Sequence, residues 1–394
     1  MAGPERIVVA RAGVVTPVGQ DLDAFWSALL TGASGISTIE RFFVGDLRVG
    51  RGGEIKKLAR VRDWTGVPEC RATRLLVAAA EDLGGRRELG AVGVDPARLG
   101  VVVGTALGGV EEGERALAGD GRRRRLRDAL YDGPGENLAR WLGARGPVLT
   151  VSTACASGAT ALALGADLLR QGRADAVVAG GYDPLCRFVM RGFDALRALT
   201  RDEVRPFDRR RAGLLLGEGA ALVLLLRARD AGPRRLGVLL GYGSASEAHH
   251  VSAPDPEGRG LARAIRAALR QAGVAADEVD LVSAHGTGTP QNDPAETRAL
   301  RHALGPRAGR VPVNAIKSGL GHTMGAAATF EAIMCLLAAR HGVIPPTRGL
   351  EEPDPACDLD LVYGAPRTGR PRVCLSTSLG FGGASAALVL GEAG

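Results

Sequence analysis

Short apolar runs of strand length alternate along the chain with longer amphipathic stretches of helix length. The short runs are rich in Val, Leu and Ala and read as buried strands, whereas the longer stretches repeat apolar residues at helical spacing. Strands that alternate with helices are typical of βαβ units, so the pattern predicts the α/β class with a mainly parallel sheet. The expected strands are 6–10, 99–104, 147–152, 174–181 and 220–226, and the expected helices include 21–31, 72–83 and 158–171.

The two halves of the chain show a weak internal repeat. The segment "GEGAALVLLL" from Gly217 matches "GGASAALVLG" from Gly382 in spacing and character. The segments from Arg98 and from Val279 likewise each carry an apolar strand into a Gly/Thr-rich turn. The repeat predicts one duplicated α/β unit with its join near 227–236, where Gly, Pro and charge interrupt two apolar strands. We therefore expect two halves, 1–232 and 233–394, packed as one body.

Composition narrows the class of protein. With 394 residues, 45% of them hydrophobic, the chain can bury a large core without staples. No stretch approaches the roughly 20 uninterrupted apolar residues of a membrane span, and no signal peptide is evident, so we expect a cytoplasmic protein and no membrane partner. The six cysteines are scattered without metal-ligand spacing, so they read as reduced thiols.

The net charge of +7 would suit an acidic partner. The dense basic run "RRRRLR" from Arg122 to Arg127 is one candidate docking site, although a solvated surface is the simpler interpretation. Neither aromatic platforms nor a nucleic-acid motif accompany it, so we do not expect nucleic-acid binding.

The segment "VLTVSTACASGATALALGADLLRQG" carries a buried strand into a turn at Cys155 and then into a long helix with small residues in its first turns. A thiol at a helix N-terminus experiences the positive end of the helix dipole, which lowers its pKa and favours a nucleophilic thiolate. The Cys155 amide could also face a developing oxyanion. On this segment alone, a buried structural cysteine is an equally good interpretation.

Two further segments place histidines on strand-end turns. In "DLVSAHGTGTPQNDPAE", His285 follows a buried strand, at the edge of an α/β sheet where ligands gather. In "VPVNAIKSGLGHTMGAAATFEAIMCLL", Lys317, His322 and Glu331 span a Gly-rich turn and the helix that we expect to begin near His322. Lys317 is one of three lysines, with Lys56 and Lys57, among 50 basic residues. A structural histidine and a solvated ion pair remain the alternatives.

One thiol and two imidazoles on such turns suit a particular chemistry. Acyl transfer needs a sulfur nucleophile, and decarboxylation of a malonyl thioester generates an enolate whose oxygen needs hydrogen-bond donors. Neutral imidazole N–H groups can donate without protonating the carbanion. Backbone amides at Cys155 and in "LGFGGAS" from Leu379 could hold the later oxyanion.

The motifs "STACASGA", "AHGTGTPQND", "KSGLGHTMGAA" and "GFGG" occur in the order seen in elongating β-ketoacyl-acyl-carrier-protein synthases, including type II polyketide ketosynthases. The chain resembles that family along nearly its whole length, as "GVVTPVG", "RPFDRRRAGLLLGEGAA" and "STSLGFGGASAAL" also match. The resemblance implies an α/β thiolase fold, in which duplicated βαβαβαββ halves stack in five layers, α-β-α-β-α.

The resemblance also implies an acyltransferase that performs a decarboxylative Claisen condensation. An acyl group would move to Cys155 and then join malonyl-acyl-carrier protein, in fatty-acid or type II polyketide or polyene biosynthesis. No metal or other cofactor is expected, because the substrates arrive on the phosphopantetheine of the carrier protein. The expected partners are that carrier and either a second copy or a chain-length-factor-like subunit.

Site roles carry over residue by residue. Cys155 resembles the acyl-accepting nucleophile, and the other catalytic positions lie in the C-terminal half. They are His285 and His322, which resemble the pair that supports decarboxylation, and Lys317 and Glu331, which resemble the supporting ion pair.

Four further residues match positions that bind or gate the substrate. Thr287 and Thr289 match residues that contact the pantetheine arm, and Leu107 matches a residue that lines the acyl pocket. Phe381 matches the gating residue, whose amide completes the oxyanion hole with that of Cys155.

Two competing functions fit the sequence less well. A non-catalytic chain-length-factor-like subunit resembles the same fold but lacks the nucleophile, so Cys155 argues against it. A thiolase acting on coenzyme A esters has a second catalytic cysteine near the C-terminus, and "STSLGFGGAS" contains none.

Overall fold

The computed structural model describes residues 5–58, 61, 64–119, 123–233 and 235–392. An 11-stranded sheet runs through the described residues in the order β12-β10-β9-β14-β15-β8-β1-β7-β6-β4-β5. The N-terminal strands are β1 (Ile7–Val15), β4 (Leu99–Gly104), β5 (Val148–Val151), β6 (Ala176–Asp183) and β7 (Gly219–Arg227). The C-terminal strands are β8 (Gly237–Ser246), β9 (Leu281–Ser283), β10 (Pro312–Asn314), β12 (Asp360–Leu361), β14 (Val373–Gly380) and β15 (Ala384–Gly391).

Helices cover both faces of the strands. The N-terminal half contributes α1 (Leu22–Thr31), α2 (Arg71–Asp82), α3 (Gly85–Val92), α4 (Val110–Leu117), α5 (Arg123–Asp128), α6 (Gly133–Leu142), α7 (Ser157–Arg170) and α8 (Arg187–Ala195). The C-terminal half contributes α9 (Arg259–Ala272), α10 (Asn292–Leu304), α11 (Lys317–Leu320) and α12 (Ala327–His341). Two small ribbons, β2 (Ile36–Thr38) with β3 (Arg51–Gly53) and β11 (Val343–Ile344) with β13 (Arg367–Thr368), lie outside the main sheet.

The two halves share one topology. Five strands from each half follow the same spatial order, β1-β7-β6-β4-β5 and β8-β15-β14-β9-β10, and β1 joins the two sets by pairing with β8. With α2, α6 and α7 in the first half and α9, α10 and α12 in the second, each half reads βαβαβαββ. The strands β7 and β15, which carry the repeated sequence segments, occupy equivalent places, so the predicted duplication is confirmed.

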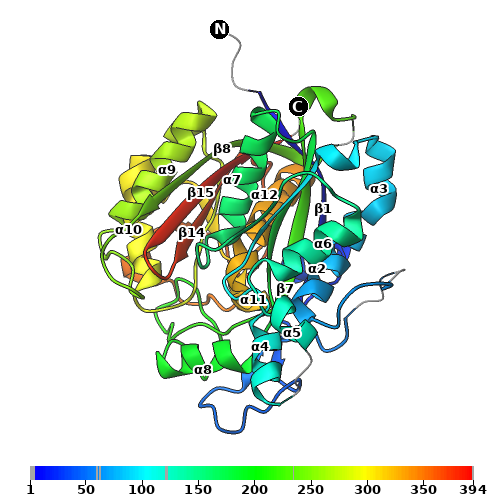
Figure 1. The fold of residues 1–394 in the computed structure, drawn as a ribbon. Helices are drawn as coiled ribbons and strands as arrows, with labels where there is room; N and C mark the ends of the chain where they lie inside the picture. The colour runs from blue at the N-terminus through cyan, green and yellow to red at the C-terminus, as the bar shows by residue number, and fades with distance from the viewer. Residues whose placement is uncertain (1–4, 59–60, 62–63, 120–122, 234, 393–394) are drawn as a thin grey trace.

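The elements stack in five layers (Figure 1). The helices α2 and α6 pack on the outer face of the first strand set, and α9 and α10 cover the outer face of the second. Between the two sets lie α7 and α12, which contact each other and strands of both halves. This is the predicted α-β-α-β-α arrangement, and it places the N-terminal ends of the two central helices in the middle of the molecule.

The expectation of a mainly parallel sheet is wrong. Half of the strand pairings in the 11-stranded sheet are antiparallel: β7 pairs in this way with β1 and β6, β15 with β8 and β14, and β1 with β8. The β14–β15 connection spans only three residues, 381–383, and so short a turn joins antiparallel strands. Composition could not reveal the reversal, because a strand buried on both faces is an apolar run in either direction.

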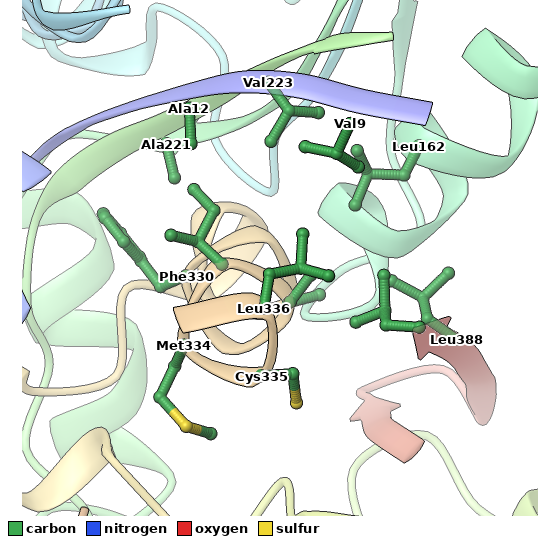
Figure 2. Close-up of a cluster of buried hydrophobic side chains, with 14 of the residues drawn as sticks. Val9, Ala12, Leu162, Ala221, Val223, Phe330, Met334, Cys335, Leu336 and Leu388 are labelled. Carbon is green, nitrogen blue, oxygen red and sulfur yellow. The ribbon is translucent and has the colours of Figure 1, made fainter. Parts of the chain in front are cut away.

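The central helix α12 carries apolar side chains on every side, as expected for a helix enclosed by protein, and Glu331 is the one charged residue between Ala327 and Ala339. Its residues from Ala327 to Ala339 are all buried. Figure 2 shows side chains leaving α12 in several directions toward strands of both halves and toward α7. The residues labelled there belong to one buried cluster: Val9, Ala12, Leu162, Ala221, Val223, Phe330, Met334, Cys335, Leu336 and Leu388. This packing fixes the central helices, and with them the turns that precede them.

One partly buried carboxylate joins α2 to β1 and should make the stability of the fold depend on pH. Asp82, the last residue of α2, accepts the Val14 N–H of β1 at 2.9 Å. Burial, with the charges of Asp21 and Asp23, raises the pKa of Asp82 to about 7 from 3.8. Because the folded protein holds this proton more tightly than the unfolded chain does, protonation of Asp82 stabilises the fold at low pH. That stabilisation is lost as the pH rises from 3.8 through about 7.

We therefore expect Asp82→Asn to raise the melting temperature at pH 8 by roughly 1–3 °C and to change it little at pH 4. Differential scanning fluorimetry across this range measures the difference, with the exposed Glu257→Gln as the matched control. A melting-temperature difference that stays constant with pH would contradict the assignment.

In the part of the chain that the structure describes, no helix is both long enough and apolar enough to span a bilayer.

Candidate active site

Cys155 lies where β5 turns into α7, on the predicted strand-to-helix elbow. The preceding Ala154 has φ +50°, in the left-handed region that non-glycine residues seldom adopt. The turn is held by its own polar groups, because Ser157 Oγ accepts the Thr153 N–H at 2.9 Å and donates to the Ala154 carbonyl at 2.5 Å. Such backbone strain persists only where the surrounding structure fixes the turn. Here the fixed turn places the Cys155 sulfur at the start of a buried helix.

Both predicted histidines meet this sulfur. His285 follows β9, and His322 lies between α11 and a short 3-10 helix, Met324–Ala326, so α12 begins five residues later than expected. His322 Nε2 is 3.0 Å from Cys155 Sγ, and the two imidazole rings lie edge to face with centroids 5.3 Å apart. All three side chains are buried. Residues more than 160 positions apart in sequence thus form one cluster.

Electrostatics favours neutral imidazoles. Burial, together with the positive charge of Lys317, lowers the pKa of both His285 and His322 well below 6.5. For the thiol the sequence predicts a lowered pKa, and the structure gives the opposite direction. Burial raises the pKa of Cys155 to about 12, against opposing effects of Lys317 and of a hydrogen bond from the Phe381 amide. Loss of hydration therefore raises the pKa of Cys155 by more than the helix N-terminus lowers it, and the side chain rests as a neutral thiol.

The tautomer of His322 follows from its backbone contact. The Met324 N–H donates to His322 Nδ1 at 3.3 Å, so in the neutral ring the proton resides on Nε2, the atom that faces Cys155. Cys155, His285 and His322 offer ligand atoms within 4.8 Å of one another, the spacing of a metal site. A metal ion would have to displace that Nε2 proton and sit in the field of Lys317, so the cluster suits hydrogen-bond donation better than cation binding.

Lys317 and Glu331 form a buried ion pair, as predicted. The Lys317 ammonium donates to Glu331 Oε1 and, at 2.6 Å, to the backbone carbonyl of His285. Burial raises the pKa of Glu331 to about 7, while Lys317 opposes the shift. The pair thus fixes the His285 backbone and supplies the positive charge that keeps both imidazoles neutral.

Two carboxylates that we did not single out in the sequence support the His285 turn. Glu296 accepts the N–H groups of His285 and Gly286 at 2.7 and 2.9 Å, and Asp293 accepts that of Gly288 at 3.2 Å. Both acids lie in the first turns of α10 and are fully buried. The signal was present in "PQNDPAE", where acids begin a helix directly after the Gly/Thr turn, the position at which carboxylates catch backbone amides.

A cavity of about 320 Å³ leads to the cluster. Cys155, His285, His322, Thr287 and Thr289 all line it, and the two threonine hydroxyls are 3.0 Å apart. Such paired hydroxyls can accept or donate hydrogen bonds to an amide-containing arm.

Phe381 also lines the cavity, half-exposed, with its ring stacked on Phe193 at 5.5 Å. Interaction with its backbone amide lowers the pKa of Cys155. Leu107, by contrast, lies in a buried apolar cluster with Met190, Leu199 and Met324, and its place in an acyl pocket stays a prediction. Of the basic run, Arg122 lies outside the described residues, and Arg127 pairs with Glu136 at 3.0 Å.

Comparison with known proteins agrees with this geometry. The family described as Beta-ketoacyl synthase, N-terminal domain, matches residues 4–231, and the C-terminal domain of the same family matches residues 236–351. The chain is 39% identical to the tetracenomycin polyketide synthase ketoacyl synthase alpha subunit of Streptomyces glaucescens, over 98% of this chain and 97% of that protein. It is 35% identical to 3-oxoacyl-[acyl-carrier-protein] synthase 2 of Synechocystis sp., over 96% of each.

A solved structure, the ishigamide ketosynthase/chain length factor, superposes with a TM-score of 0.90 at 34% identity and covers 100% of both chains. Sequence and fold agree over the same span, and that span holds the Cys155, His285 and His322 cluster. The chain therefore belongs to the beta-ketoacyl synthase family.

Proposed function

We propose that Cys155 is the acyl-carrying nucleophile of the decarboxylative condensation that this β-ketoacyl synthase catalyses. The observation that carries the proposal is the convergence of one sulfur and two neutral imidazoles in a single cavity, with Nε2 of His322 3.0 Å from Sγ. In a non-catalytic partner subunit this convergence would have no purpose.

In the first half-reaction, Sγ attacks the carbonyl carbon of an acyl thioester on the carrier protein. The acyl carbon to carrier sulfur bond breaks, and the proton of the Cys155 thiol ends on the released carrier thiol. The Phe381 N–H, whose interaction with the thiol lowers the pKa of Cys155, and the Cys155 N–H are suited to hold the oxyanion that forms. The acyl group is then stored on the enzyme.

In the second half-reaction, malonyl-carrier protein enters with its thioester oxygen facing the two imidazoles. Loss of carbon dioxide leaves the electron pair of the broken bond on an enolate, and Nε2–H of His322, with His285, stabilises its oxygen. The carbanion attacks the acyl-Cys155 carbonyl, and the Cys155 thiolate leaves and regains a proton from water. The product is a β-ketoacyl thioester on the carrier.

The remaining site residues take supporting roles. The Lys317 and Glu331 pair positions His285 and keeps the imidazoles neutral, and Leu107 borders the acyl chain. Thr287 and Thr289 contact the pantetheine arm, and Phe381 gates the entrance. Each step uses groups of the chain itself and the carrier's phosphopantetheine, so we propose that no added cofactor takes part.

The carrier protein should dock at the cavity mouth. Arg197 lines the mouth and is exposed, with φ +54°. A guanidinium at this place can attract an acidic partner, the kind of partner that the net positive charge of the chain suits. A similar protein, 3-oxoacyl-[acyl-carrier-protein] synthase 2, is named for an acyl-carrier protein.

We expect Arg197→Glu to raise KM for the acyl-carrier protein by about tenfold, because a rim charge of the wrong sign repels an acidic partner. Acylation by a small acyl thioester such as acyl-N-acetylcysteamine should change by less than about twofold. Arg270→Glu, an exposed arginine at the end of α9, is the matched control. An equal loss with both acyl donors would remove Arg197 from docking.

The edge strand β5 is suited to a dimer. It ends the sheet and exposes Val148 and Leu149 at 37% and 36%, an apolar edge of the kind that proteins cover. We propose that a second copy or a chain-length-factor-like subunit covers it, since the similar solved structure is named as a ketosynthase with a chain length factor.

The 39% identity to a polyketide synthase subunit favours a polyketide pathway over primary fatty-acid synthesis.

Two further assignments complete the proposal. The halves 1–232 and 233–394 are the two structural domains, a division that the shared strand order supports. The enzyme works in the cytoplasm, where its six buried free thiols would stay reduced.

The test is incubation with acyl-carrier proteins of varied chain length and unsaturation, followed by intact-mass analysis of the enzyme. An acyl adduct on Cys155 and, after malonyl-carrier protein is added, a β-ketoacyl product with carbon dioxide release are the expected results. The preferred chain identifies the substrate. A protein that takes up no acyl group from any carrier, alone or with a partner subunit, would contradict the function.

A further inference from the structure

Asp183 is a buried acid next to the catalytic cluster that the proposed mechanism leaves unused. It is the last residue of β6, its exposed fraction is 0%, and it belongs to the N-terminal half. A carboxylate in such a place must be fully hydrogen-bonded to be tolerated. Its partners therefore show what it holds.

On one side Asp183 holds the turn that follows β4. Its Oδ1 accepts the Thr105 hydroxyl at 2.5 Å and the Leu107 N–H at 2.9 Å, and its Oδ2 accepts the Ala106 N–H at 2.9 Å. The Thr105 oxygen also accepts the Gly108 N–H at 2.7 Å. The whole turn 105–108, which presents Leu107, is thus fixed by one carboxylate.

On the other side Asp183 holds the turn that leads into α12. Its Oδ2 accepts the Gly325 N–H at 2.7 Å, and the neighbouring Met324 donates its N–H to His322 Nδ1. Met324 has φ +49°, matching the +50° of Ala154 in the equivalent turn before α7. This second strained turn sets the ring orientation of His322.

The two turns also touch directly. A methyl group at Gly325 would lie 2.6 Å from Thr105 Cα and 2.8 Å from Asp183 Oδ2, and one at Gly158 would lie 2.8 Å from the Gly325 carbonyl oxygen. Backbone from both halves therefore meets at this carboxylate, beside the first turn of α7.

We propose that Asp183 is a positioning residue for the condensation, joining the Leu107 turn and the Met324–Gly325 turn into one rigid unit that orients His322 against Cys155. The inference rests on the proposed function. It adds a residue that neither the sequence motifs nor the mechanism required.

The charge of Asp183 gives the proposal a separate signature. Burial raises the pKa of Asp183 to about 6, so it is mainly ionised at neutral pH, and its negative charge in turn raises the pKa of Cys155. The other charged or titratable groups that act on the thiol are Lys317, Glu331 and the two imidazoles. Lys317 lowers the pKa of Cys155 and Asp183 raises it. When the negative charge of Asp183 is removed, the pKa of the thiol should therefore fall.

The first test is Asp183→Asn, read by the pH profile of Cys155 alkylation with iodoacetamide and by carbon dioxide release from malonyl-carrier protein. Above pH 6, where Asp183 is ionised in the wild type, we expect the variant to be alkylated up to about tenfold faster because a nearby negative charge is lost, and below pH 6 the two rates should converge. Decarboxylation should fall by about tenfold, because the orientation of His322 is lost. If Asp183 only stabilised the fold, Asp183→Asn would slow both the alkylation of Cys155 and the release of carbon dioxide. A uniform rise in alkylation at every pH would report a more exposed sulfur and would overturn the electrostatic link.

The second variant, Thr105→Val, removes the Thr105 hydroxyl, which donates to Asp183 and accepts the Leu107 and Gly108 N–H groups, and it keeps the charge of Asp183. Decarboxylation should fall about threefold with the alkylation profile unmoved. This variant also decides the matter if Asp183→Asn does not fold, since unchanged decarboxylation would overturn the proposal. The control is Asp208→Asn, an equally buried acid that accepts the Glu351 and Glu352 N–H groups. Alkylation needs no substrate, so Asp183 can be tested even if the proposed function fails.

Discussion

Cys155→Ala is expected to abolish acyl uptake, so that no acyl adduct is found by intact mass after incubation with any acyl-carrier protein. The variant lacks the one thiol among the described residues that line the cavity, which is the proposed acyl acceptor, and condensation should fall by at least about 10³-fold. The fold should survive, because the exchange removes one sulfur from a site that is already open to a cavity. Circular dichroism and thermal melting would check that point.

The matched control for this prediction is Cys186→Ala. Cys186 precedes α8 as Cys155 precedes α7, and it is also buried, so both thiols lie at a helix N-terminus. Burial raises the pKa of Cys186 as well, and it lies in an apolar cluster away from the imidazoles. Acylation should therefore persist in the control. Loss of acylation in both variants, or in neither, would contradict the role of Cys155.

The comparison of these two cysteines also shows how far the sequence can be read. Strand-to-helix transitions are local, and the expected elements 21–31, 72–83 and 158–171 match α1, α2 and α7 within one residue at each end. The elbow at Cys155 and the strand-end position of His285 follow from the same local patterns. A position at a helix N-terminus, however, does not distinguish Cys155 from Cys186. Only the resemblance of "STACASGA" to a family motif identified Cys155 as the candidate nucleophile.

What the sequence could not supply depends on contacts between distant segments. The direction of β7 and β15, the raised pKa of Cys155 and the convergence of His322 on Sγ all arise from the packing of two halves around α7 and α12. The buried acid Asp183 could not be recognised for the same reason, since its partners lie on distant turns from both halves of the chain. No motif around Asp183 separates it in the sequence from a solvated acid.

His322→Ala is the second substitution with a large expected effect, and it should separate the two half-reactions. The enolate of the malonyl group would lose its Nε2–H donor, and decarboxylation should fall by roughly 10²–10⁴-fold, the usual loss when one preorganised donor is removed. In the proposed mechanism, acyl transfer to Cys155 relies on backbone amides and not on His322, so it should slow by less than about tenfold. Carbon dioxide release and intact-mass acylation, measured on the same preparation, give the two rates.

His302→Ala, which removes an exposed histidine of α10, is the control and should alter neither rate. His322→Gln offers a finer test, because its side-chain N–H could still donate without a titratable ring, and part of the lost decarboxylation should return. Since burial and Lys317 keep the native imidazole neutral, the wild-type rate should not show the ordinary histidine titration near pH 6.5. Unchanged carbon dioxide release in His322→Ala would show that the enolate forms elsewhere, and the hydrogen bond to Cys155 would then be the only task left to this ring.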